Sequence, residues 1–192
     1  MGEAVRALDR INVAPLHTQA DVAALNARFE GVPAADMVAV VLGEKLLGNV
    51  ALVSSFGAES AVLLHLVASA APETPVLFLE TGKHFPETLA YRDKLAALLG
   101  FNLINIMFDS AALVEKDATG LRWSYDPDGC CHIRKVLPLE CALEGYDASI
   151  TGRKGFQSGT RAGLPRFEWD GAAGRIKWNP LASWTKADLD AY

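Results

Sequence analysis

The chain of 192 residues is 51% hydrophobic and 21% charged, with a formal net charge of −5, which fits one globular domain with a sizeable core. No apolar run approaches the roughly 20 residues that span a bilayer, and the N-terminus lacks the basic segment and apolar core of a secretion signal. An acidic chain also argues against general nucleic-acid binding. We therefore expect a cytoplasmic protein with neither membrane nor nucleic-acid partners.

Residues 1–48 form a predicted N-terminal helical segment, which precedes an α/β domain over 49–192. Thr18 and Asp21 make a capping-box pattern at the start of one helix, and Pro33 is placed to start a second helix. We interpret both helices as structural.

From residue 49 onward, apolar runs that favour strands alternate with stretches of helical spacing. The strands are expected at about 50–54, 76–79, 102–107 and 148–151. This alternation predicts an α/β fold with a doubly wound, mostly parallel sheet flanked by helices. A hairpin over 166–178 follows. A helix that begins at Thr185 stops at Tyr192 while it is still short, so we expect the chain to be truncated there.

The loop after the first predicted strand is a candidate anion site. Small polar residues and a glycine follow an apolar run, and a helix is predicted next. The free N–H groups at the start of a helix and the positive end of its dipole favour an anion. The candidate contacts are Ser54, Ser55, Phe56, Gly57 and Ser60. The alternative is an ordinary strand-to-helix turn, because neither of the usual glycine-rich nucleotide motifs is present.

A second candidate loop follows the second predicted strand. It lies at the carboxyl end of that strand, where ligands bind in open α/β sheets. Its candidate contacts are Glu80, Thr81, Gly82, Lys83 and His84.

A third candidate loop is basic. The stretch from Thr151 to Phe167 contains four basic residues and no acidic one. A local cationic island in an acidic chain suits a small anionic ligand. The candidates are Gly152, Arg153 and Arg161, and the alternative is a solvated basic loop.

The three cysteines are too few for a disulfide framework. Adjacent Cα atoms lie about 3.8 Å apart, below the roughly 4.4 Å minimum of ordinary disulfides, so Cys130 and Cys131 are poor partners for each other. A helix that begins near Cys130 would place both thiols close to Arg134 and Lys135, which favours thiolates. The alternative is that both cysteines are buried as small hydrophobic residues. Cys141 is expected in a helix core.

Pro138 follows the tandem cysteines within the same predicted helix. Because proline has no backbone N–H and clashes with the preceding turn, we expect a kink at this point or a helix that starts only near Leu137.

Several stretches together resemble one family. Ser54–Ser60 resembles the phosphate loop of the adenine-nucleotide α-hydrolase (PP-loop) superfamily. Cys130–Leu139 resembles the tandem-cysteine signature of assimilatory adenylyl-sulfate (APS) reductases, within the family that also reduces phosphoadenylyl sulfate (PAPS). Leu79–Thr88, Thr151–Ala162 and Ile176–Thr185 resemble three further segments of that family.

The resemblance implies thioredoxin-dependent reduction of APS to sulfite and AMP, in sulfate assimilation and cysteine biosynthesis. PAPS is a second substrate that some such enzymes accept. The resemblance also implies that Arg153 and Arg161 face phosphate and sulfate oxygens, and that Lys135 and Arg161 act in catalysis. A homo-oligomer is an open possibility for the assembly.

The resemblance further implies that Cys130 and Cys131 are two ligands of a [4Fe–4S] cluster in the full-length protein. The downstream Cys-x-x-Cys pair and the nucleophilic cysteine of that family are absent from this sequence. We therefore expect this chain to bind the nucleotide but to be inactive alone.

Two other functions stay open. An ATP-using PP-loop adenylyltransferase or ligase would share the fold, although Phe56 and Glu59 depart from the Ser-Gly-Gly-x-Asp-Ser loop usual in those enzymes. A non-enzymatic nucleotide- or metal-binding module could join Cys130 and Cys131 to the ligands of a partner protein.

Overall fold

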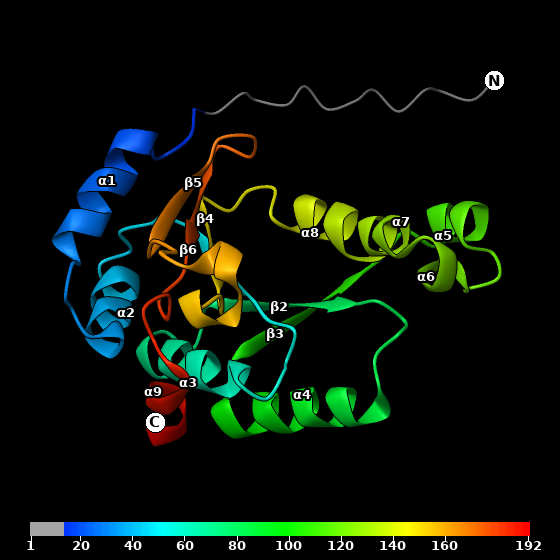
Figure 1. Cartoon of the computed structure of the whole chain (residues 1–192), viewed down its shortest axis with the longest axis horizontal. Coiled ribbons are helices and arrows are strands. Elements are labelled where there is room, and N and C mark those ends of the chain that lie inside the picture. Colours follow the sequence, from blue (N-terminus) through cyan, green and yellow to red (C-terminus); the bar gives the residue numbers. More distant parts are fainter. Residues whose placement is uncertain (1–13) are drawn as a thin grey trace.

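A six-stranded sheet, in the order β3-β2-β1-β4-β6-β5, forms the centre of the computed structural model, which describes residues 14–192 (Figure 1). Neighbouring strands pair in parallel throughout, except β5, which is antiparallel to β6. The predicted doubly wound, mostly parallel sheet is therefore confirmed. The first thirteen residues of the predicted N-terminal segment lie outside the described residues.

The strands are β1 (Val50–Val53), β2 (Pro75–Glu80), β3 (Asn102–Met107), β4 (Ala148–Thr151), β5 (Phe167–Asp170) and β6 (Arg175–Trp178). The helices are α1 (Gln19–Arg28), α2 (Ala34–Gly43), α3 (Ser60–Ala70), α4 (Pro86–Leu99), α5 (Ser110–Lys116), α6 (Arg122–Tyr125), α7 (Pro127–Cys131), α8 (Leu137–Ala142) and α9 (Lys186–Ala191). A π-helical turn (His132–Val136) joins α7 to α8, and 3₁₀ turns cover Gly155–Gln157 and Gly159–Arg161.

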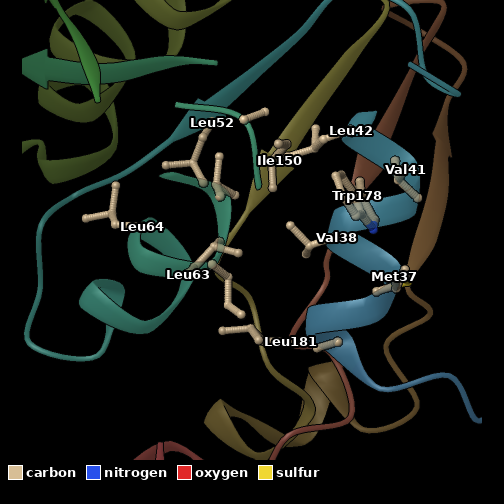
Figure 2. Close-up of a cluster of buried hydrophobic side chains, with 14 of the residues drawn as sticks. Met37, Val38, Val41, Leu42, Leu52, Leu63, Leu64, Ile150, Trp178 and Leu181 are labelled. Carbon is tan, nitrogen blue, oxygen red and sulfur yellow. The ribbon is translucent and has the colours of Figure 1, made fainter. Parts of the chain in front are cut away.

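Helices cover both faces of the sheet, which explains why its central strands are continuous apolar runs. Successive side chains on a strand point to opposite faces. Leu52 on β1 packs into the larger core with residues of α2 and α3, whereas its neighbour Ala51 packs on the other face with Leu143, which follows α8. Figure 2 shows the larger core, where Val38 and Trp178 are among the completely buried side chains.

The N-terminal helices belong to the same core as the sheet. Asn26 on α1 donates to the carbonyl of Phe167 on β5 at 2.8 Å and accepts from its N–H at 3.1 Å. The Arg166 guanidinium donates to the carbonyls of Phe29 and Val32 at 2.7 and 2.6 Å. Burial lowers the pKa of Arg166. Together these contacts fasten α1 and the α1–α2 turn to the edge of the sheet.

The strand order places a switch point beside β1. The chain runs from β1 to β2 and β3 on one side, and β4 then pairs with the other side of β1. In open α/β sheets, ligands bind at the carboxyl ends of the strands where the order reverses in this way. The loops after β1 and β4 are therefore the loops that the fold brings together. Within residues 14–192, none of the helices combines the length and apolarity needed to cross a bilayer.

Candidate functional site

A cleft of about 620 Å³ lies at this switch point, over the carboxyl ends of β1 and β4. The loop after β1, the loop after β4 and one side of α8 supply its walls. The predicted site residues that line it are Ser54, Ser55, Gly57, Ser60, Gly152, Arg153 and Arg161. The first and third predicted loops, about 100 residues apart along the chain, therefore form one site.

Phe56 holds the loop after β1 against the hydrophobic core. This residue has a left-handed backbone, with φ at 54°, which is unusual for a large side chain. Its ring is buried and contacts the rings of Phe78 and Phe101, with centroids 5.5 and 6.1 Å away. Phe56 does not line the cleft, unlike the other four predicted residues of this loop. Its ring thus anchors the loop to the core.

The three serines of this loop differ in how much of their hydrogen-bonding capacity is used. The hydroxyl of buried Ser54 accepts from the N–H of Phe56 at 3.2 Å, and Ser60 donates to the carbonyl of Gly57 at 2.5 Å. Ser55 is exposed, and its hydroxyl has no hydrogen-bond partner among residues 14–192. Ser55 is thus the hydroxyl that is available to a ligand.

Two of the cations in the loop after β4 are paired with carboxylates. Arg153 forms an ion pair with Glu168, which also accepts from Asn179 at 2.8 Å. Lys154 is buried, and its Nζ lies 3.0 Å from Oε2 of Glu59 in the loop after β1. Their partners Glu59 and Glu168, and the buried position of Lys154, were not singled out from the sequence.

Arg161 is different, because its Nη1 donates to the amide oxygen of Gln157 at 2.7 Å and meets no carboxylate within the described part of the chain. Lys177, which also lines the cleft, pairs with Asp170 at 2.7 Å. Among the basic residues that line the cleft, Arg161 is therefore the one whose charge is not offset by an acidic side chain.

The second predicted loop turns away from this cleft, and its residues do not line it. The Glu80 carboxylate accepts from the N–H of Gly82 at 2.9 Å. Lys83 donates to the carbonyl of Gly120 at 2.8 Å. The ring of His84 bonds to the carbonyl of Leu79 at 2.8 Å. Buried Thr81 accepts through its carbonyl from Arg134, so this loop faces the cysteine segment instead.

The cysteine segment begins with a short helix. This helix, α7, begins at Pro127, three residues before Cys130, and contains both cysteines. Proline suits the first position of a helix, and Asp126 caps it by accepting from the N–H of Gly129 at 2.9 Å. A Cβ on Gly129 would lie 2.1 Å from that carboxylate, so a larger residue before the cysteines would displace the Asp126 and Arg122 side chains.

The expected irregularity at Pro138 takes the form of the π-helical turn His132–Val136, after which α8 starts at Leu137. Proline lacks the N–H that would continue a regular α-helical ladder, and π turns are frequent at functional sites. Cys130 is buried and Cys131 is exposed. Cys141 is exposed as well, so the expectation that it lies in a helix core is wrong.

The thiols of Cys130 and Cys131 do not make a complete metal site by themselves. Within residues 14–192, no group of three or more His, Cys, Asp or Glu side chains is arranged to hold a metal ion. A [4Fe–4S] cluster needs four thiolate ligands, so the donor set of this chain fits half of such a site. Lys135 is exposed and does not line the cleft.

Arg134, beside Lys135, is buried and connects three parts of the structure, which sequence patterns did not reveal. It donates to the Thr81 carbonyl at 2.7 Å and to the Asp117 carboxylate at 2.8 Å, and its guanidinium lies 5.3 Å from the centre of the Phe108 ring. Two hydrogen bonds lower the pKa of Asp117. The larger effect comes from Arg134, and the next from the N–H of Arg122.

The fold and the cleft together define the class of protein. A mostly parallel sheet with a serine-rich loop and a basic loop meeting at its switch point is the arrangement of an open α/β protein that binds a ligand at the carboxyl ends of its strands. Within that class, the chain belongs to the phosphoadenosine phosphosulfate reductase domain family, whose sequence profile matches residues 49–192.

Relatives of the chain agree with this family, and a solved structure shares its fold. The chain is 46% identical to the adenosine 5'-phosphosulfate reductase of Chelativorans sp. (strain BNC1), over 93% of this chain and 73% of that protein. It is 44% identical to the enzyme of the same name from Mesorhizobium japonicum, over 97% of this chain and 73% of that protein. A phosphoadenylyl-sulfate reductase from Candida auris, solved as a phosphate complex, has the same fold, with a TM-score of 0.75 and 24% identity. The match covers 94% of this chain and 87% of that chain.

Proposed function

We propose that this protein is a thioredoxin-dependent APS reductase of sulfate assimilation, and that its cleft binds the sulfonucleotide. The observation that carries the proposal is the meeting of the serine loop and Arg161 at the switch point of a chain in this family. The two relatives that support the choice of APS over PAPS are both named adenosine 5'-phosphosulfate reductases.

The cleft residues have separate roles in this proposal. Ser55 donates its hydroxyl to a phosphate oxygen, and the N–H groups at the start of α3 face the same anion. Arg161 supplies the positive charge that the anionic ligand requires. Arg153 contacts the ligand only if it leaves Glu168, so we expect it to contribute less than Arg161.

The reaction moves two electrons to the sulfur of APS. A thiolate bonds to that sulfur while the bond from sulfur to the AMP oxygen breaks. A thioredoxin thiolate then attacks the protein sulfur, sulfite leaves with the electron pair, and the second thioredoxin thiol resolves the mixed disulfide. None of Cys130, Cys131 and Cys141 lines the cleft, so we do not assign the attacking thiolate to them.

We further propose that Cys130 and Cys131 are one half of an iron–sulfur site whose other thiolates lie outside the described residues. A π-helical turn follows directly after Cys131, and such turns are frequent at functional sites. When bound, such a cluster would supply local charge beside the site. Cys130→Ser or Cys131→Ser in the cluster-loaded protein should lower iron and sulfide content, and full content in both variants would contradict this role.

The residues Glu80–His84 and Lys135 remain proposed contacts on the family resemblance. In the present structure the loop bonds to neighbouring backbone, and Lys135 is exposed. Their contribution follows from the affinity of alanine variants for APS compared with AMP. A loss confined to APS would place them near the sulfate.

The experiment that tests the function combines binding and turnover. The 192-residue chain should bind AMP and APS by calorimetry, yet release no sulfite with reduced thioredoxin, because no cysteine lines the cleft. Pyrophosphate release from ATP would instead favour an adenylyltransferase or ligase. Failure to bind either nucleotide would overturn the proposed site.

A further inference from the structure

Glu59 is an acidic residue inside the proposed anion site. It lies directly before α3 and lines the cleft, so its carboxylate would repel an anionic ligand. Two contacts from the loop after β4 account for it. Lys154 Nζ lies 3.0 Å from its Oε2, and Gln157 Nε2 lies 3.5 Å from the same oxygen.

The contact between Glu59 and Lys154 fastens the two loops of the cleft to each other. The residues are 95 positions apart, and the lysine is almost completely buried whereas the carboxylate is about one-third exposed. The hydrogen bond from Lys154 lowers the pKa of Glu59 and keeps its carboxylate ionised. The negative charge of Glu59 is thus balanced by Lys154 and does not repel a ligand.

Gln157 continues this network to Arg161. Its amide nitrogen faces the Glu59 carboxylate, which can only accept hydrogen bonds. The amide oxygen must then point the other way, where it accepts from Arg161 Nη1 at 2.7 Å and from the backbone N–H of Lys154 at 3.2 Å. The carboxylate and the two N–H donors therefore favour the same orientation of the amide, and the amide oxygen holds the guanidinium.

We propose that Glu59 and Gln157 are positioning residues, which hold Arg161 over the cleft for the anionic part of the sulfonucleotide. This inference rests on the proposed function. A neutral amide suits the role, because it orients the guanidinium by a hydrogen bond and leaves its positive charge for the ligand. A carboxylate at position 157 would neutralise Arg161 and would face Glu59 with a like charge.

The test uses calorimetric affinity for AMP. Gln157→Ala should weaken binding by about tenfold or less, the effect of one hydrogen bond, and Gln157→Glu should weaken it more than Gln157→Ala. Gln157 is exposed, so both variants should keep the melting temperature of the parent. Gln19→Ala on the exposed start of α1 is the matched control and should bind like the parent.

A double substitution separates positioning from an independent contact. In an Arg161→Ala background, Gln157→Ala should cause no further loss of AMP affinity. The double variant should therefore bind AMP no more weakly than Arg161→Ala alone. Glu59→Gln should reduce affinity in the same dependent way. Additive losses, or parental affinity in Gln157→Ala, would overturn the positioning role. Absence of AMP and APS binding in the parent chain would instead overturn the proposed function itself.

Discussion

Arg134 and Asp117 form an ion pair at 2.8 Å in which both side chains are almost completely buried, 5% and 0% exposed. The same guanidinium donates to the Thr81 carbonyl, so the pair fastens the cysteine segment to the end of β2. Removing one partner of a buried ion pair is costly because the other charge stays uncompensated. Fixing the cysteine segment to the sheet therefore depends on both residues.

Arg134→Met should lower the free energy of unfolding by on the order of 3 kcal/mol, because it leaves Asp117 buried without its partner. Denaturant unfolding measures this change. The matched control is Arg28→Met, whose exposed pair with Glu44 should be worth about 1 kcal/mol at most. Equal losses in the two variants would show that the buried pair has no special role.

The stability of the protein should fall in acid, in part through Asp117. Hydrogen bonds from Arg134 and from the N–H of Arg122 place its folded pKa below its unfolded value. The stabilisation is therefore present above about pH 4 and is lost as the pH falls through the folded pKa. Asp117→Asn should be less stable than the parent at pH 7, and the difference should shrink below pH 4. A constant difference from pH 7 to pH 3 would contradict this assignment.

Arg161→Ala should weaken AMP or APS binding by about 1.5–3 kcal/mol, the range for hydrogen bonds to charged groups. The reason is that Arg161 is the cleft cation without an acidic partner among the described residues. Calorimetry measures the affinity, with Arg28→Ala on the exposed face of α1 as the control for charge. Unchanged affinity in Arg161→Ala would return the loop after β4 to the status of a solvated basic loop.

Ser54 and Ser55 should respond differently to alanine. Ser55→Ala should cost about 0.5–1.5 kcal/mol of nucleotide affinity with little change in stability, since its hydroxyl is exposed in the cleft. Ser54→Ala should lower the melting temperature, because the buried N–H of Phe56 loses its acceptor. Paired calorimetry and thermal unfolding distinguish the two, and the reverse pattern would mean that the roles are exchanged.

The two adjacent thiols should differ in reactivity in metal-free protein. In a Cys141→Ser background, which removes the other exposed thiol, Cys131 should react rapidly with a colorimetric disulfide reagent and buried Cys130 slowly. Stopped-flow absorbance would show one fast thiol per chain and a second after unfolding. Two equally fast thiols would contradict the burial of Cys130 and the exposure of Cys131.

Local patterns in the sequence were sufficient for the type of fold. Alternating strand and helix signals predicted the parallel sheet, the capping box predicted at Thr18 forms, and a helix follows Thr185. The serine loop after β1 and the basic loop after β4 were also identified as candidates for anion binding. Each of these features is determined by a short stretch of neighbouring residues, because helix starts, strands and turns depend on contacts within a few positions.

Only the tertiary structure decided which of the candidates meet. Strand order brings the loops after β1 and β4 into one cleft and turns the loop after β2 toward Arg134. It also pairs Lys154 with Glu59 across 95 residues and buries one cysteine while exposing the next. A basic residue looks the same in a sequence whether or not a distant carboxylate offsets its charge. Partners of this kind come from packing between elements far apart along the chain, which no local pattern records.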